Sequence, residues 1–558
     1  MILDLITQLW LLMKRIILYF VTEILPSCTK WAIWFGMMML RCIMMPFIRL
    51  RWLRPSRKLP PIENKVLMHS AICLAHMIRT KQITCEEVIK VYIRRVREVN
   101  PLLNAMVDDR FDTAMQEAKT VDRMVSQGRH TAEELAEKFP LLGVPLTVKG
   151  SIEVKGLSNA CGQVRKVGER AAKDADSVRL MRDAGAIVLL VSNCPELCMS
   201  YETDNKVTGT TNNPYDLRRT PGGSSGGEAA LLGAAASVIG LVSDIGGSSR
   251  IPAMFTGVFG HKPTPGLVSD VGHIPTATDK NWYRYFSVSL MARYSEDLCP
   301  VLKILSHKNA RSLRFDEEMK VRDLKVFYME DDGGSILTNK VHSEIRQAMR
   351  KVLSHLKVSH QINPQKIQIK DFKNAIELSL STLLSLQGVT SIFQKDSDPT
   401  EWKSVCLEVL KYFVCLSSSN FPPILYGVGK KIIDRIPESQ MREIANKINS
   451  IQKQLKTLLG DDGVFLYPTF TDPAGFHMEM YFKFFNSVYS AVFNTLELPA
   501  TNCPVGLTKN GLPISIQIIA APYQDRLSIL LAQELEVAFG GWVPPPEIHR
   551  EGTFVEHS

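Results

Sequence analysis

Residues 222–250 read GGSSGGEAALLGAAASVIGLVSDIGGSSR, in which a glycine–serine loop, a run of small residues, an apolar run and a second glycine–serine turn follow one another. The small residues favour a closely packed helix, and the apolar run VIGLVS has the length of a strand that is buried on both faces. A buried strand that follows a helix is typical of α/β proteins, whose sheets are covered by helices. This stretch therefore predicts an α/β fold.

The same alternation of helix and strand patterns extends from this stretch towards both ends of the chain. Strand patterns are apolar runs, and helix patterns repeat apolar residues at helical spacing. Thr84 and Glu87 form a capping-box pattern ahead of the first helix. Residues 300–480 read as mixed helices and loops without a motif. The predicted elements are helices at 86–100 and 110–125, a strand at 141–149, a helix and a strand within 177–192, a strand at 512–522 and a helix at 525–540.

The cysteines indicate free thiols and no disulfide framework. The chain has 558 residues and 11 cysteines, an odd number, with no C-x-x-C pair. Scattered cysteines of this kind are typical of a reducing compartment. Cys194 and Cys198 lie four positions apart, but no histidine or third cysteine near them in the sequence completes a metal-binding set. We therefore predict no structural metal there.

The first 58 residues differ from the rest of the chain in charge. They carry nine lysines and arginines against two acidic residues, so most of the net charge of +9 lies in this segment. The rest of the chain is close to neutral and has no basic stripe, which speaks against nucleic acid as a partner.

Strongly apolar runs fill the same segment and predict a membrane anchor at residues 1–58. The longest run, residues 31–48, is marginal in length for a membrane span and contains Arg41. We expect one span or a pair of helices lying partly in the bilayer, while a buried helix pair is the alternative. The basic cluster at 49–58 favours a cytosolic body. The expected location is an intracellular membrane, such as the endoplasmic reticulum or a lipid droplet.

The first glycine–serine loop allows several interpretations. Residues 222–226, GGSSG, match the G-x-S-x-G pattern of a nucleophile elbow, but that turn needs a strand directly before it. The preceding residues NNPYDLRRTP predict a loop instead. A phosphate-binding P-loop is excluded because no Gly-Lys-Ser/Thr closes the motif.

The second turn, DIGGSSR at 244–250, suits an anion. Consecutive amides in such a turn form a nest that can hold an oxyanion beside a serine nucleophile. A base is needed, and the ionisable group at the end of a nearby apolar strand is Lys149. Desolvation lowers the pKa of a lysine, so a buried lysine that reaches a serine can replace histidine. The alternative for Lys149 is a solvated strand end.

Taken together, these motifs resemble those of the amidase signature family of serine hydrolases. The matching blocks are GVPLTVK at 143–149, GGSSGGEAA at 222–230, DIGGSSR at 244–250 and GLPISIQIIAAPYQD at 511–525. The resemblance covers roughly residues 65–545, so we place an amidase domain at 59–550 and a tail at 551–558. It implies a large twisted mixed sheet covered by helices on both faces. Ser249 departs from the family, which usually has isoleucine there.

The resemblance also implies a Ser–Ser–Lys triad. Ser248 would be the nucleophile, and Ser224, after a cis peptide from Gly223, would connect it to Lys149. The reaction needs no metal or organic cofactor. The residues implied to contact substrate are Ser224, Ser248, the backbone of Ile245, Gly246 and Gly247, and Cys198 and Met199.

Within the family, the chain is similar to the fatty-acid amide hydrolases, which implies a lipid amide as substrate and allows a homodimer. Two alternatives remain at this point. One is the amidase component of an amidotransferase that acts on charged transfer RNA, or another general amidase, and the other is an inactive membrane-bound binding or scaffold protein.

Overall fold

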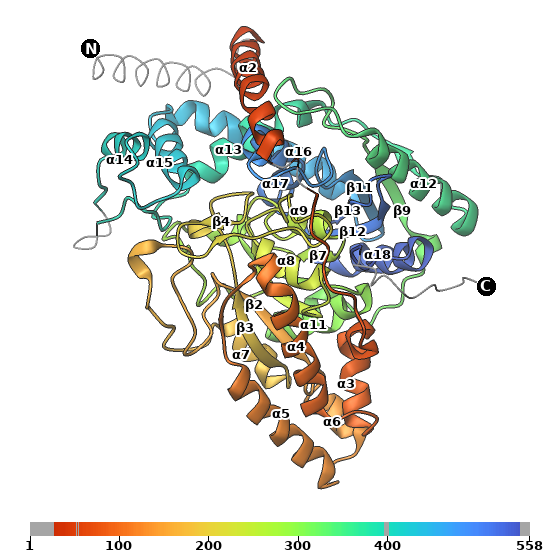
Figure 1. Cartoon of the computed structure of the whole chain (residues 1–558). Coiled ribbons are helices and arrows are strands. Elements are labelled where there is room, and N and C mark those ends of the chain that lie inside the picture. The colour runs from red at the N-terminus through yellow and green to blue at the C-terminus, as the bar shows by residue number, and fades with distance from the viewer. Residues whose placement is uncertain (1–26, 52, 54, 396–400, 547–558) are drawn as a thin grey trace.

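Eleven strands form a single mixed sheet in the order β1-β3-β2-β6-β8-β7-β12-β13-β11-β9-β10. The computed structural model that contains them describes residues 27–51, 53, 55–395 and 401–546 (Figure 1). The strands are β1 Met106–Asp109, β2 Pro145–Lys149, β3 Ile187–Ser192, β6 Ile239–Asp244, β7 Phe259–Lys262, β8 Ser287–Ala292, β9 Lys325–Tyr328, β10 Gln365–Lys366, β11 Gly463–Pro468, β12 Ala500–Leu507 and β13 Pro513–Ala520, beside a separate pair, β4 Asp204–Asn205 and β5 Gly209–Thr210.

Helices cover this sheet on both faces, as the sequence predicts. Every residue of β2, β3, β6, β8, β11 and β13 is buried, which requires cover on each side. The helices are α2 Ser27–Arg51, α3 Ala71–Arg79, α4 Cys85–Leu103, α5 Phe111–Ser126, α6 Ala132–Lys138, α7 Asp176–Asp183, α8 Gly226–Gly233, α9 Arg250–Thr256, α10 Trp282–Tyr285, α11 Leu298–Ser306, α12 Ser343–His360, α13 Ala375–Ser385, α14 Val405–Phe413, α15 Phe421–Ile433, α16 Glu438–Leu459, α17 Val488–Thr495 and α18 Asp525–Phe539.

The centre of the sheet is parallel where the site motifs lie. β2 pairs in parallel with both β3 and β6, so the carboxyl ends of these three strands meet at one edge. All predicted strands and helices are present. Thr84 caps α4 by accepting a hydrogen bond from the Glu87 amide (3.1 Å), and α4 runs on past Pro101 to Leu103, further than predicted.

A layer of helices made of α13–α17 lies above this sheet (Figure 1). α13 packs against α15, α16 and α17, and α14 packs against α15. These helices come from residues 375–495, most of which carry no sequence motif. Side chains of α13, α15 and α16 line part of a cavity.

The N-terminal helix α2 stands beside this layer and contacts the 3₁₀ helix η8, Glu479–Ser487. Met45 and Ile48 of α2 are buried, whereas Phe35, Ile43 and Phe47 are more than half exposed. No helix in the described ranges combines the length and apolar character that crossing a membrane requires. Residues 1–26 of the predicted anchor lie outside the described residues.

Candidate active site

Lys149 ends the inner strand β2 and is completely buried. The alternative of a solvated strand end is therefore wrong. Its Nζ donates hydrogen bonds to the Oγ atoms of Ser224 (2.7 Å) and Ser243 (3.1 Å). Within the described part of the chain, the groups bonded to this amine are thus two hydroxyls, which can exchange a proton with it.

Ser224 lies in the loop before α8 and is 1% exposed. No strand occurs among residues 211–223, so the described chain lacks the strand that a nucleophile elbow needs. The peptide bond between Gly223 and Ser224 is cis. A Cβ on Gly223 would lie 2.6 Å from the carbonyl oxygen of Ser200, so a side chain has no room at this position.

Ser248 lies in the turn between β6 and α9, beside the loop of Ser224. The amide of Ser225 donates a hydrogen bond to the carbonyl oxygen of Ser248 (3.3 Å), which ties the two glycine–serine loops together. Ser224 and Ser248 line the same cavity. The structure therefore brings together three motifs that are separated by up to about a hundred residues in the sequence.

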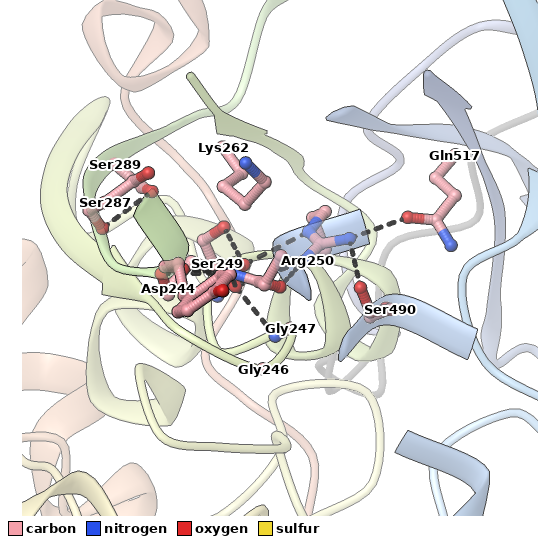
Figure 2. A network of polar contacts seen from close by, with 12 residues as sticks. Asp244, Gly246, Gly247, Ser249, Arg250, Lys262, Ser287, Ser289, Ser490 and Gln517 are labelled. Atoms are coloured by element: carbon pink, nitrogen blue, oxygen red, sulfur yellow. Dashed lines mark hydrogen bonds and ion pairs between the residues drawn. The ribbon is translucent and has the colours of Figure 1, made fainter. Parts of the chain in front are cut away.

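Asp244 organises the turn that carries Ser248 (Figure 2). Its carboxylate accepts hydrogen bonds from the amides of Gly247 (2.7 Å) and Ser249 (3.0 Å) and from the Ser249 hydroxyl (2.7 Å). The guanidinium of Arg250 donates two more, each 3.1 Å long. Burial alone would raise the pKa of Asp244, but the charge and hydrogen bonds of Arg250 outweigh it and hold this pKa far below its ordinary value.

This arrangement corrects the predicted role of Gly247. Its amide is bonded to Asp244, and Gly247 does not line the cavity, unlike Ile245, Gly246 and Ser248. The physical reason is that the carboxylate of Asp244, at the end of β6, accepts hydrogen bonds from amides of the following turn and so fixes its conformation. The same carboxylate holds the Ser249 hydroxyl, so this additional serine points away from the cavity that Ser248 lines.

The cavity above these residues is large and mainly apolar. It has a volume of about 610 Å³ and reaches from the two serines into the helical layer. Cys198 and Met199, both predicted to contact substrate, line it. The apolar residues of the wall include Leu378, Leu384, Leu425, Ile432, Met480 and Phe484.

Comparisons with known proteins agree with this geometry. The family model described as "Amidase" matches residues 87–529 of the chain. The chain belongs to the amidase signature family. Human fatty-acid amide hydrolase 2 is 39% identical over 490 residues, which cover 87% of this chain and 92% of that protein. A glutamyl-tRNA(Gln) amidotransferase subunit from Alkaliphilus metalliredigens is 27% identical, over 84% of this chain and 96% of that protein.

Among solved structures, one titled "Fatty acid amide hydrolase" has a TM-score of 0.68 at 22% identity, over 86% of this chain and 87% of that one. At this identity the likeness shows the fold. The predicted amidase-signature fold with a large mixed sheet is thereby confirmed.

In this amidase, a buried histidine stands behind the lysine. His273 Nδ1 must donate to the carbonyl oxygen of Pro275 (2.8 Å), because a carbonyl only accepts. Nε2 is then the acceptor for the hydroxyls of Ser243 (2.9 Å) and Ser151 (3.0 Å). Ser243 in turn accepts a hydrogen bond from Lys149. Burial lowers the pKa of His273 to about 4, so the ring is neutral near pH 7.

Sequence patterns did not reveal His273 or the cavity wall. His273 lies in a loop, and only the fold places it against Ser243. The wall comes from the region without a motif, where apolar residues at helical spacing are equally compatible with an ordinary core.

Proposed function

We propose that this protein is a serine hydrolase that cleaves lipid amides, with Ser248 as nucleophile and Ser224 and Lys149 as its proton relay. The observation that carries the proposal is the buried contact of 2.7 Å between Lys149 Nζ and Ser224 Oγ beside Ser248, at the end of an apolar cavity.

The reaction begins with the unprotonated amine of Lys149. It takes the proton of Ser224, Ser224 takes that of Ser248, and the Ser248 oxygen attacks the carbonyl carbon of the amide. The same relay then returns a proton to the nitrogen, because an amide expels its amine only when that nitrogen is protonated. Water hydrolyses the resulting acyl-enzyme by the reverse path.

Backbone amides stabilise the negative charge that develops on the carbonyl oxygen. With the amide of Gly247 engaged by Asp244, the donors available in this turn are those of Ile245, Gly246 and Ser248, all of which line the cavity. Donors that are held in place before the reaction lower the barrier most, because nothing has to reorient as charge develops. Asp244 and Arg250 supply this rigidity from behind the turn.

The substrate class follows from the cavity wall and from the relative. An apolar space of about 610 Å³ suits an acyl chain, since each buried CH₂ group contributes about 0.8 kcal/mol. The name of the human relative, fatty-acid amide hydrolase 2, points to the same chemistry. A polar substrate, as in the amidotransferase alternative, would leave its polar groups unpaired against this wall.

Exposed apolar side chains near the cavity support a second part of the proposal. Residues 1–58 would hold the protein on a membrane, and the lipid substrate would enter the cavity from that membrane. Phe421 and Leu425 of α15 both line the cavity and are partly exposed, so the cavity opens at this helix. α14, packed against α15, exposes Leu407 and Phe413. α2 contacts η8, which forms part of the cavity wall. A lipid amide could then enter without crossing water.

A fluorophosphonate probe and a set of amides test this function. We expect the probe to label Ser248, and we expect hydrolysis to improve with acyl chain length at a constant amine. Absence of labelling in folded protein would favour the inactive scaffold, and a preference for short polar amides would contradict the lipid assignment.

A further inference from the structure

Three cysteines from two segments of the chain meet beside the candidate active site. Cys161 lies in a turn after β2, Cys194 follows β3, and Cys198 ends the 3₁₀ helix η3, Glu196–Cys198. The Sγ atom of Cys161 lies 3.9 Å from that of Cys194 and 3.9 Å from that of Cys198. All three sulfur atoms lie within 4.8 Å of one another. Sequence spacing did not reveal the third ligand because Cys161 is 33 positions from Cys194.

We propose that Cys161, Cys194 and Cys198 form a binding site for a thiophilic divalent metal ion such as Zn²⁺. Thiolates bind zinc at about 2.3 Å, which places the sulfur atoms of a tetrahedral site about 3.8 Å apart. The two distances of 3.9 Å match that spacing. A disulfide, in contrast, needs sulfur atoms about 2.0 Å apart. Three thiolates leave a fourth position for water.

The backbone holds these thiols in an arrangement that cysteines rarely adopt. Cys161 and Cys198 both have left-handed conformations, with φ of 46° and 58°. Such conformations are uncommon outside glycine and are maintained only where the surrounding structure imposes them. The amide of Leu197 donates a hydrogen bond to the carbonyl oxygen of Cys161 (3.0 Å), which fixes one loop against the other. Apolar packing alone does not require this geometry.

Occupancy of the site should inhibit hydrolysis. The metal binds the cysteines as thiolates, so a divalent ion with three of them carries one net negative charge. Cys198 lines the same cavity as Ser224 and Ser248, so this charge lies at the wall of the cavity in which the oxyanion would develop. Like charges at close range in a buried site raise the barrier. The inhibition rests on the proposed function, whereas the binding does not.

Cobalt(II) added to the reduced full-length protein tests the binding. We expect one Co²⁺ per chain with thiolate-to-metal charge-transfer absorption, lost in Cys161→Ser and, separately, in Cys194→Ser. Cys503→Ser is the matched control, because Cys503 is equally buried and its Sγ contacts backbone carbonyls. Circular dichroism of the metal-free variants verifies folding. Absence of the band in wild type, or its persistence in both folded variants, would overturn the site.

Zinc inhibition of amide hydrolysis tests the consequence. We expect Zn²⁺ to reduce wild-type activity by about tenfold, reversibly with a chelator, and to leave Cys161→Ser unaffected. Cys161 does not line the cavity, so its variant should retain the metal-free activity. Equal inhibition of both proteins would contradict a regulatory role of the cysteine site. The zinc would then bind elsewhere, and His355, His360 and Glu534 form a further candidate metal site among the described residues, one that gives no thiolate band. If no amide is hydrolysed, the cobalt spectrum still decides the binding.

Discussion

Lys149 Nζ and Ser224 Oγ are 2.7 Å apart, although the two residues are separated by 75 positions in the chain. Both side chains are withdrawn from solvent, with exposures of 0% and 1%. Among the described residues, the groups hydrogen-bonded to this amine are the hydroxyls of Ser224 and Ser243, from which it can take a proton. The proposed relay therefore begins at this contact.

The nucleophile can be separated from its neighbours by single substitutions. Ser248→Ala should abolish fluorophosphonate labelling and lower hydrolysis by about 10⁴-fold or more, because no covalent intermediate forms. Ser249→Ala is the matched control and should retain labelling, since its hydroxyl is held by Asp244. Labelling that survives in Ser248→Ala but disappears in Ser224→Ala would assign the nucleophile to Ser224 instead.

Lys149→Met should reduce amide hydrolysis by more than the roughly 10²–10⁴-fold that one acid–base group supplies, because activation of the nucleophile and protonation of the leaving amine both fail. Lys262→Met provides the control, as Lys262 is also completely buried but its Nζ bonds to the carbonyl oxygen of Pro263. The kcat of both variants is measured with a soluble amide. An effect of Lys149→Met below tenfold at every pH would exclude this lysine from the mechanism.

His273 should act as a positioning residue through Ser243. His273→Leu removes the acceptor for the Ser243 hydroxyl, and we expect kcat to fall by about tenfold to a hundredfold with little change in KM. His273→Gln retains an acceptor and should recover part of kcat. If the two variants lose kcat equally, or if KM alone changes, the histidine has only a packing role.

The exposed face of α2 should hold the protein on membranes. Replacement of Phe35, Ile43 and Phe47 by serine removes about 1.5–3 kcal/mol of apolar transfer free energy per residue, so the protein should move to the soluble fraction. Turnover of long-chain amides in vesicles should fall, while that of short soluble amides stays unchanged. Met45 and Ile48 remain, so the contact of α2 with the body is kept. A variant that still pellets with membranes would place the binding surface elsewhere.

Lys262 should make stability depend on pH. Burial and then the charge of Arg250 lower its pKa from 10.5 to about 7. Between these values the unfolded chain carries a proton that the folded chain lacks, so stability rises with pH by at most about 1.4 kcal/mol per unit. Chemical unfolding of wild type and Lys262→Met at several pH values between 7 and 10 measures this. Parallel pH dependences of the two proteins would contradict the shift.

Local sequence patterns predicted much of this molecule. The helix α5, the strands β2, β3 and β6, and the alternation of helix and strand all follow from the spacing of apolar residues. These features depend on neighbours within a few residues, so the chain reveals them directly. The motifs containing Lys149, Ser224 and Ser248 are short stretches too, and their resemblance to the blocks of the amidase signature family linked them before the structure did.

Tertiary structure alone decided how those stretches act on one another. The burial of Lys149, the hold of Asp244 on the amide of Gly247, and the meeting of Cys161 with Cys194 and Cys198 all depend on contacts across loops. The cavity wall depends on how helices from residues 375–495 pack above the sheet. The spacing of apolar residues predicts that a helix buries one face. Which element covers that face depends on packing between segments that are distant in the sequence, and no local pattern encodes this packing.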